Sequence, residues 1–236
     1  MNVRRFRGGI LALCSLIIAG CDRAPGRPQP DAEVRPNEIK DFSRLYAENC
    51  SGCHGKNGKN GPAIALANPT YQAIVDDTTL HDAIADGESG TLMPAFAQSS
   101  GGMLTGEQVN VLVTGIRSRW RKADALKGLH APPYKSGKEG DLTHGQQIFD
   151  TDCRSCHASG MQKVKAGSVT DGSFLALVSD QALRVIVIAG RPDIGHPDWR
   201  GVESGHPLSD DDVTDVVAWI ASQRQKIPGQ PYPSQP

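Results

Sequence analysis

Two short runs of the sequence carry the residue types needed to attach a metal-containing group covalently. Cys50-Ser51-Gly52-Cys53-His54 and Cys153-Arg154-Ser155-Cys156-His157 share the pattern Cys-x-x-Cys-His. In such a run the two thiols form thioether bonds with a haem, and the adjacent histidine ligates its iron. Cysteine pairs also hold structural zinc, but the pairs of one zinc site usually lie far closer than these, which are 103 residues apart. The pattern therefore predicts two covalently bound haem c groups.

The other cysteines leave no thiol for further chemistry. Of the six cysteines in the chain, four belong to the two runs. Cys14 lies inside an apolar stretch near the amino terminus, and Cys21 follows that stretch directly. We therefore expect neither a structural disulfide nor a nucleophilic thiol in the mature protein.

Residues 1–20 have the pattern of a secretory signal peptide. Arg4, Arg5 and Arg7 precede a short apolar run that ends in Ile18-Ala19-Gly20-Cys21. The run is too short to span a bilayer. Its end resembles the lipobox of bacterial lipoproteins, which implies acylation of Cys21 and a membrane-anchored lipoprotein facing the periplasm or a similar extracytoplasmic space. An ordinary secretory cleavage beside an incidental Cys21 is the alternative.

The composition limits the classes of partner and of fold. The chain has 26 glycines, 16 prolines and only 5% aromatic residues, so a purely protein core in each of two small domains would be thin. Without the three arginines of the signal peptide, 22 basic residues stand against 26 acidic ones, a net charge of −4. This balance excludes the basic footprint of a nucleic-acid-binding protein.

An internal repeat with a constant offset of 103 residues organises the chain. It pairs Tyr46 with Phe149 and Gly87 with Gly190, and it needs no insertion between residues 46 and 199. The predicted segments are a signal peptide (1–20), a flexible tether (21–36), a first module (37–121), a linker (122–141), a second module (142–227) and a disordered tail (228–236).

Both modules are expected to be helical. Apolar residues recur with helical spacing after four candidate N-cap residues, which are Asn37, Thr105, Thr143 and Ser209. The expected fold class is all-α.

Residues 38–120 and 142–225 resemble the class I cytochrome c family. The resemblance rests on the two Cys-x-x-Cys-His runs and on Leu92-Met93-Pro94-Ala95-Phe96, and it implies two tandem helical domains, each wrapped around a haem c. It further implies that Met93 is the sixth iron ligand in the first module, with Met103 as the competitor. It also implies that the carbonyl of Pro62 accepts a hydrogen bond from the ring of His54.

The second module departs from the family pattern at the sixth ligand. The repeat places His196 at the register of Met93, and the following Pro197 and Trp199 match Pro94 and Phe96. We therefore predict that His157 and His196 ligate the second iron. His206, also followed by proline, and an open coordination position are the alternatives. Met161 lies too close to His157 to reach the opposite haem face.

Family members often cross their first and last helices at a small residue facing an aromatic one. Gly145 and Trp219 stand at these positions in the second module, and the repeat places Phe42 and Gly115 there in the first. We expect the same contact in both modules, with the small and large residues exchanged.

The predicted function is electron transfer rather than catalysis. Two saturated irons suit a membrane-tethered dihaem cytochrome that relays single electrons between redox proteins, such as a quinol-oxidising complex, a terminal oxidase or a soluble cytochrome. Thioether ligation by Met93 would place the first haem at the higher potential. A dihaem redox enzyme, such as a peroxidase or a small-anion oxidoreductase, and a permanent subunit of a respiratory complex are the alternatives.

Overall fold

A computed structural model describes residues 34–157 and 166–225 of the chain. The signal peptide, Cys21, most of the tether, Met161 and the tail lie outside this range. The chain divides into two compact units, Met1–Glu38 and Ile39–Pro236. The first contains the 3-10 turn η2 (Pro36–Glu38), and every contact described below belongs to the second. No helix in the described ranges is long and apolar enough to cross a membrane.

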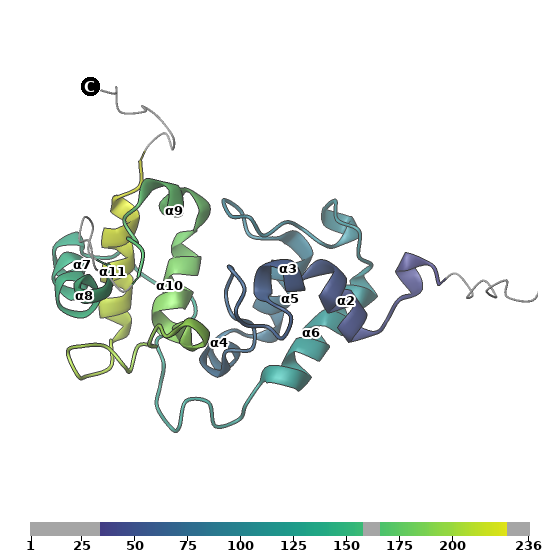
Figure 1. The fold of residues 1–236 in the computed structure, drawn as a ribbon, viewed down its shortest axis with the longest axis horizontal. Coiled ribbons are helices and arrows are strands. Elements are labelled where there is room, and N and C mark those ends of the chain that lie inside the picture. Colours follow the sequence, from purple (N-terminus) through teal and green to yellow (C-terminus); the bar gives the residue numbers. More distant parts are fainter. Residues whose placement is uncertain (1–33, 158–165, 226–236) are drawn as a thin grey trace, which may run out of the picture. The chain divides into compact units, whose positions relative to one another are not determined.

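The described part of the second unit is built from helices, and its only β pairing is two isolated bridges, so the predicted all-α class is confirmed. Two sets of helices follow each other along the chain (Figure 1). The first set is α2 (Phe42–Asn49), α3 (Ser51–His54), α4 (Pro69–Ile74), α5 (Asp77–Asp86), η3 (Gln98–Ser100) and α6 (Gly106–Trp120). The second set is α7 (Leu142–Ile148), the π-helix η4 (Phe149–Cys153), α8 (Arg154–His157), α9 (Gly172–Leu177), α10 (Asp180–Ala189), η5 (Pro192–Ile194) and α11 (Asp210–Ser222).

The two sets repeat the same order with the predicted offset. The helices α3, α4 and α5 begin 103 residues before α8, α9 and α10, whereas α6 begins 104 residues before α11. The offset therefore grows by one residue before the last helix, and two equivalent hydrogen bonds show where. Leu104 N–H donates to the Phe96 carbonyl, and Leu208 N–H donates to the Trp199 carbonyl. The two acceptors are 103 residues apart, but the two donors are 104 apart. One residue is therefore inserted between the end of the repeat found in the sequence and the last helix.

Helix starts follow the side chains that can cap them. Thr105 and Ser209 cap α6 and α11 as predicted, each within a reciprocal capping box. Asn37 and Thr143 are not the N-caps of α2 and α7. Asp41 and Asp141 take these positions, and their carboxylates accept hydrogen bonds from N–H groups of the first helical turn.

The first and last helices of each set cross at a glycine, as expected from the repeat. In the first set, a Cβ atom at Gly115 of α6 would overlap the ring of Phe42 on α2. In the second, a Cβ atom at Gly145 of α7 would overlap the Asp215 carbonyl oxygen and lie 2.9 Å from the Trp219 Cβ, both on α11, and the Trp219 and Phe149 rings lie 4.5 Å apart. The predicted exchange of small and large residues is confirmed.

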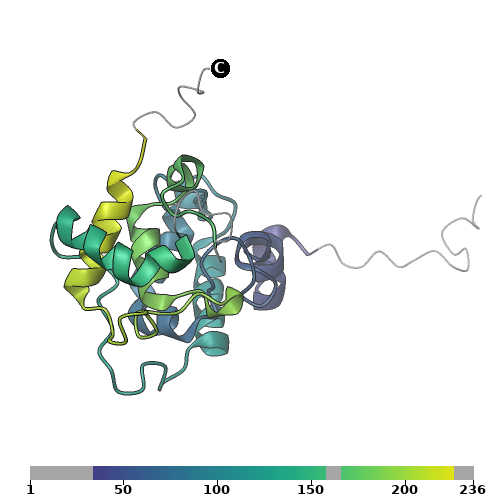
Figure 2. The ribbon, with the colours of Figure 1, turned by 60° about the vertical axis from the view of Figure 1, so that its left-hand side comes forward.

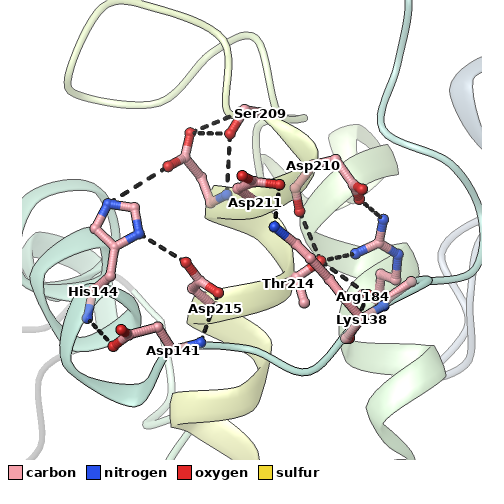
Figure 3. A network of polar contacts seen from close by, with 11 residues as sticks. Lys138, Asp141, His144, Arg184, Ser209, Asp210, Asp211, Thr214 and Asp215 are labelled. Atoms are coloured by element: carbon pink, nitrogen blue, oxygen red, sulfur yellow. Dashed lines mark hydrogen bonds and ion pairs between the residues drawn. The ribbon is translucent and has the colours of Figure 1, made fainter.

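Polar contacts complete the packing of α11 against α7 and α10 (Figure 3). Asp215 of α11 accepts hydrogen bonds from His144 Nδ1 and from Asp141 N–H, both at 2.8 Å. On the other side of α11, Arg184 of α10 pairs with Asp210 and donates to Thr214 Oγ1 at 3.0 Å. The last helix is thus fixed on two sides by charged side chains.

An arginine holds the carbonyl end of the equivalent helices α4 and α9. Arg117 donates to the carbonyls of Gln72 (2.8 Å) and Val75 (2.7 Å) and pairs with Asp77. Arg224 donates to the carbonyls of Leu175 (3.1 Å) and Val178 (2.7 Å) and pairs with Asp180. The bound residues are 103 apart, so the two arginines make the same contacts.

Candidate haem sites

The two Cys-x-x-Cys-His runs occupy equivalent short helices, α3 and α8. Cys50 is buried, Cys53 is exposed, and Cys153 and Cys156 are partly buried. Burial is the main cause that raises the pKa of both Cys50 and Cys153 to about 12. Burial thus favours the neutral thiol over the thiolate at the first cysteine of each run.

Each histidine of these runs is oriented by a backbone carbonyl ten residues later. His54 Nδ1 lies 2.8 Å from the Ile64 carbonyl oxygen, and His157 Nδ1 lies 2.8 Å from the Gly167 carbonyl oxygen. A carbonyl only accepts, so Nδ1 must carry the proton, and Nε2 keeps the lone pair that can ligate iron. Ile64 and Gly167 stand at the same position of the repeat, and nothing in the sequence around Gly167 indicated this role.

The expectation that Pro62 accepts the hydrogen bond from His54 is corrected by this geometry. The next residue, Ala63, donates its N–H to the Cys53 carbonyl at 2.9 Å. In a planar trans peptide the C=O points opposite to the N–H, so the Pro62 carbonyl points away from the Cys53–His54 backbone. The Ile64 carbonyl, two residues later, takes its place.

The candidate sixth ligands lie in equivalent turns. Glu88 N–H donates to the Met93 carbonyl, and Arg191 N–H donates to the His196 carbonyl, both at 3.1 Å. Each turn packs against a glycine with positive φ. This glycine is Gly87 (+73°) for the turn of Met93 and Gly190 (+65°) for the turn of His196. A Cβ atom at Gly87 would lie 2.7 Å from the Met93 carbonyl oxygen, so only glycine lets the chain pass so closely.

The second site has room for a metal between two histidines. The rings of His157 and His196 have centroids 5.9 Å apart. Two imidazoles bound to one metal through bonds of about 2 Å would have centroids about 6 Å apart. Among the described residues, His196 Nδ1 is a buried nitrogen without a hydrogen-bond partner. These observations fit an iron held by both rings.

The alternative ligands are placed less favourably. His206 is exposed, whereas His196 is partly buried. In the first set, Met103 has 81% of its surface exposed, and Met93 is partly buried. In the described ranges, no group of three or more His, Cys, Asp or Glu side chains gathers as around a bare metal ion.

Both sites disfavour a charged imidazole. Burial is the main cause that lowers the pKa of His54 and of His196, and the nearby positive charge of Arg191 lowers both further. A neutral imidazole is the form that ligates a metal. One guanidinium is thus close enough to act electrostatically on a histidine of each site.

A helical fold in which Cys-x-x-Cys-His helices present carbonyl-bound histidines is that of c-type cytochrome domains, which bind haem c covalently. The family described as "Cytochrome C oxidase, cbb3-type, subunit III" matches residues 37–114 and 140–220. The chain belongs to this family.

Similar proteins agree with this class. Cytochrome c6 of Cyanidioschyzon merolae is 30% identical over 86 residues, which cover 36% of this chain and 78% of that protein. Cytochrome c6 of Cyanidium caldarium is 29% identical over 86 residues, or 36% of this chain and 74% of that protein. A chain of the Kuenenia stuttgartiensis reducing HAO-like protein complex Kustc0457/Kustc0458 is 18% identical with a TM-score of 0.44, covering 79% of this chain and 99% of that one. That last likeness is too weak to bear on function.

Proposed function

We propose that the protein is a dihaem cytochrome that relays single electrons between redox proteins. In this proposal Cys50, Cys53, Cys153 and Cys156 attach two haem c groups, and a lipid on Cys21 holds the exported protein at the membrane. The observation that carries it is the equivalence of the two sites, from the carbonyl-bound His54 and His157 to the turns of Met93 and His196.

Different sixth ligands would separate the two sites in potential. Haem c supplies a one-electron iron couple when it is bound. A methionine thioether favours the reduced state and raises the potential relative to bis-histidine ligation. Met93 would therefore make the first site the stronger oxidant, and His196 the second the stronger reductant.

A second candidate function follows from the family itself. The family is described as an oxidase subunit, which favours a permanent place in a respiratory complex. The redox chemistry of the two sites is the same in both cases. Purification from the native membrane in mild detergent distinguishes them, because a subunit co-purifies with its complex and a free carrier does not.

Low-temperature EPR of the oxidised full-length protein tests the ligation. We expect two low-spin signals, one of the His/Met type and one of the His/His type. Met93→His should convert the first signal to the second type and lower the potential of that haem. His196→Met should do the reverse at the other haem. Met103→Leu, an exposed control ten residues after Met93, should change neither signal.

Two results contradict the proposal. A high-spin signal in the resting protein that disappears on adding cyanide would indicate an open iron and favour a dihaem enzyme. Two identical signals that respond to neither Met93→His nor His196→Met would remove these residues as ligands.

A further inference from the structure

A buried ion pair lies between the two candidate haem sites. Arg191 and Asp193 follow the end of α10, and their side chains are only 9% and 5% exposed. The guanidinium donates to both carboxylate oxygens of Asp193, through Nε at 3.0 Å and Nη2 at 2.8 Å. This bidentate pairing is one cause that lowers the pKa of Asp193 to about 2, so the pair is charged at neutral pH.

The ion pair binds the loop that follows the first haem motif. Arg191 Nη2 donates to the Gly61 carbonyl at 2.8 Å, and Asp193 accepts from Asn60 N–H at 2.7 Å. Gly61 packs against the motif itself, since a Cβ atom there would lie 2.8 Å from the carbonyl carbon of His54. Gly61 therefore links the ion pair to His54, the proposed iron ligand of the first site.

The same residues belong to the turn that presents His196. Arg191 and His196 form an antiparallel bridge, in which Arg191 N–H donates to His196 O at 3.1 Å and His196 N–H donates to Arg191 O at 3.0 Å. The turn between them is η5, which contains Asp193. The register equivalent of Arg191 in the first set is Glu88, so the repeat offers no second copy of this pair.

We propose that Arg191 and Asp193 are positioning residues that act on both haems at once: each charge shifts both potentials, and their pairing keeps the two opposite shifts in balance. This inference rests on the dihaem function proposed above. Reduction adds one electron and lowers the charge of each iron site by one. A nearby positive charge stabilises the reduced state and raises the potential, and a nearby negative charge lowers it.

The test is a spectroelectrochemical titration of the full-length protein with both haems, each followed by its own spectrum. Arg191→Gln leaves the Asp193 carboxylate and should lower both midpoint potentials. Asp193→Asn leaves the guanidinium and should raise both. We expect each reduction equilibrium constant to change about threefold or more, which is about 30 mV since tenfold is 59 mV for one electron. The double variant should return both potentials close to their starting values.

Arg117→Gln is the matched control. It also removes a guanidinium paired with an aspartate, but the contacts of Arg117 lie within the first helix set. It should leave the potential of the second haem unchanged.

Shifts of the same sign in both single variants, or shifts confined to one haem, would overturn the inference. A double variant that stays shifted would do so too, because it would point to packing rather than charge. If the unaltered protein shows the two expected low-spin haems, such results defeat this inference alone. A protein with a single haem would defeat the proposed function as well.

Discussion

Gly115 determines how closely α2 and α6 approach in the first helix set. Its missing side chain leaves space for the Phe42 ring, which stacks on Tyr46 with centroids 5.7 Å apart and meets Trp120 edge-on at 6.1 Å. Because a ring within an aromatic cluster cannot move without disturbing its neighbours, Gly115→Ala should destabilise the protein by about 1–3 kcal/mol. Urea unfolding of the full-length protein measures this change.

A glycine-to-alanine substitution at Gly106, also on α6, serves as the control for Gly115→Ala. Gly106 begins α6, and a Cβ atom there meets nothing within 4 Å. Gly106→Ala should therefore be neutral or stabilise by up to about 1 kcal/mol. Phe42→Leu should recover part of the loss in Gly115→Ala. Equal effects of the two glycine substitutions would show that the helix crossing does not depend on Gly115.

At the scale of residues, the sequence indicates which side chains could attach haem, but it does not indicate which backbone carbonyls accept their hydrogen bonds. The Cys-x-x-Cys-His runs predict that His54 and His157 would ligate iron, because covalent haem attachment needs these residue types at this spacing. The acceptors for their rings, Ile64 and Gly167, are backbone carbonyls, and any residue type supplies a carbonyl. Only the path of the loop selects them, which is why Pro62 was the wrong choice.

At the scale of elements, we expect the contact between α7 and α11 to depend on pH. The hydrogen bond to Asp215 is the main cause that raises the pKa of His144, and the charges of Asp212 and Asp141 add to it. A pKa raised in the folded state means that protonated His144 stabilises the fold. This contribution is complete below the unfolded pKa of about 6.5 and is lost as the pH rises through the folded pKa.

Unfolding of the full-length protein and of His144→Gln at several pH values tests this contact. We expect the variant to be less stable at pH 6 and the difference to shrink towards pH 9. In an Asp215→Asn background, His144→Gln should lose most of this pH dependence, because the main partner charge is gone. A difference that grows with pH would contradict the assigned sign.

Equivalent elements do not always use equivalent sequence positions. Arg117 and Arg224 make matching contacts with α4 and α9, yet Arg224 stands three residues beyond the register of Arg117. Arg224 lies just beyond the end of α11 at Ser222, and its long, flexible side chain reaches the equivalent carbonyls from there. The repeat therefore predicts the helices and their order, but a search for matching residues misses this interaction.

At the scale of the whole molecule, Asn68 caps two helices from different sets. Its Oδ1 accepts from Thr70 N–H (2.8 Å) at the start of α4, and its Nδ2 donates to the carbonyls of Ala189 (2.7 Å) and Gly190 (3.1 Å) at the end of α10. The segments lie side by side in both views (Figures 1 and 2). Val185 and Ala189 of α10 also belong to the apolar core of the first set.

Asn68→Asp separates the two capping roles. Aspartate still caps α4, but it cannot donate to α10 and places a buried charge against carbonyl oxygens. We expect a loss of about 2–4 kcal/mol in the free energy of unfolding. Chemical denaturation of the full-length protein measures it.

Asp171 is the matched control, because it occupies the same register and caps α9 alone. Asp171→Asn should change stability by less than about 1 kcal/mol, since both residues are good N-caps. A similar small effect of Asn68→Asp would show that the bonds to α10 contribute little.

The contact made by Asn68 and Arg191 joins unlike surfaces, the start of α4 in one set and the end of α10 in the other. A head-to-tail contact between repeated units can be made again at each free end, and it builds a ring or a filament when every unit carries both surfaces. Here neither free end can repeat the contact. The second set has Asp171 where Asn68 would donate, and the first has Glu88 where Arg191 would bind. At a further junction each of these carboxylates would face backbone carbonyl oxygens in place of a donor, which disfavours extension of the contact beyond the two sets.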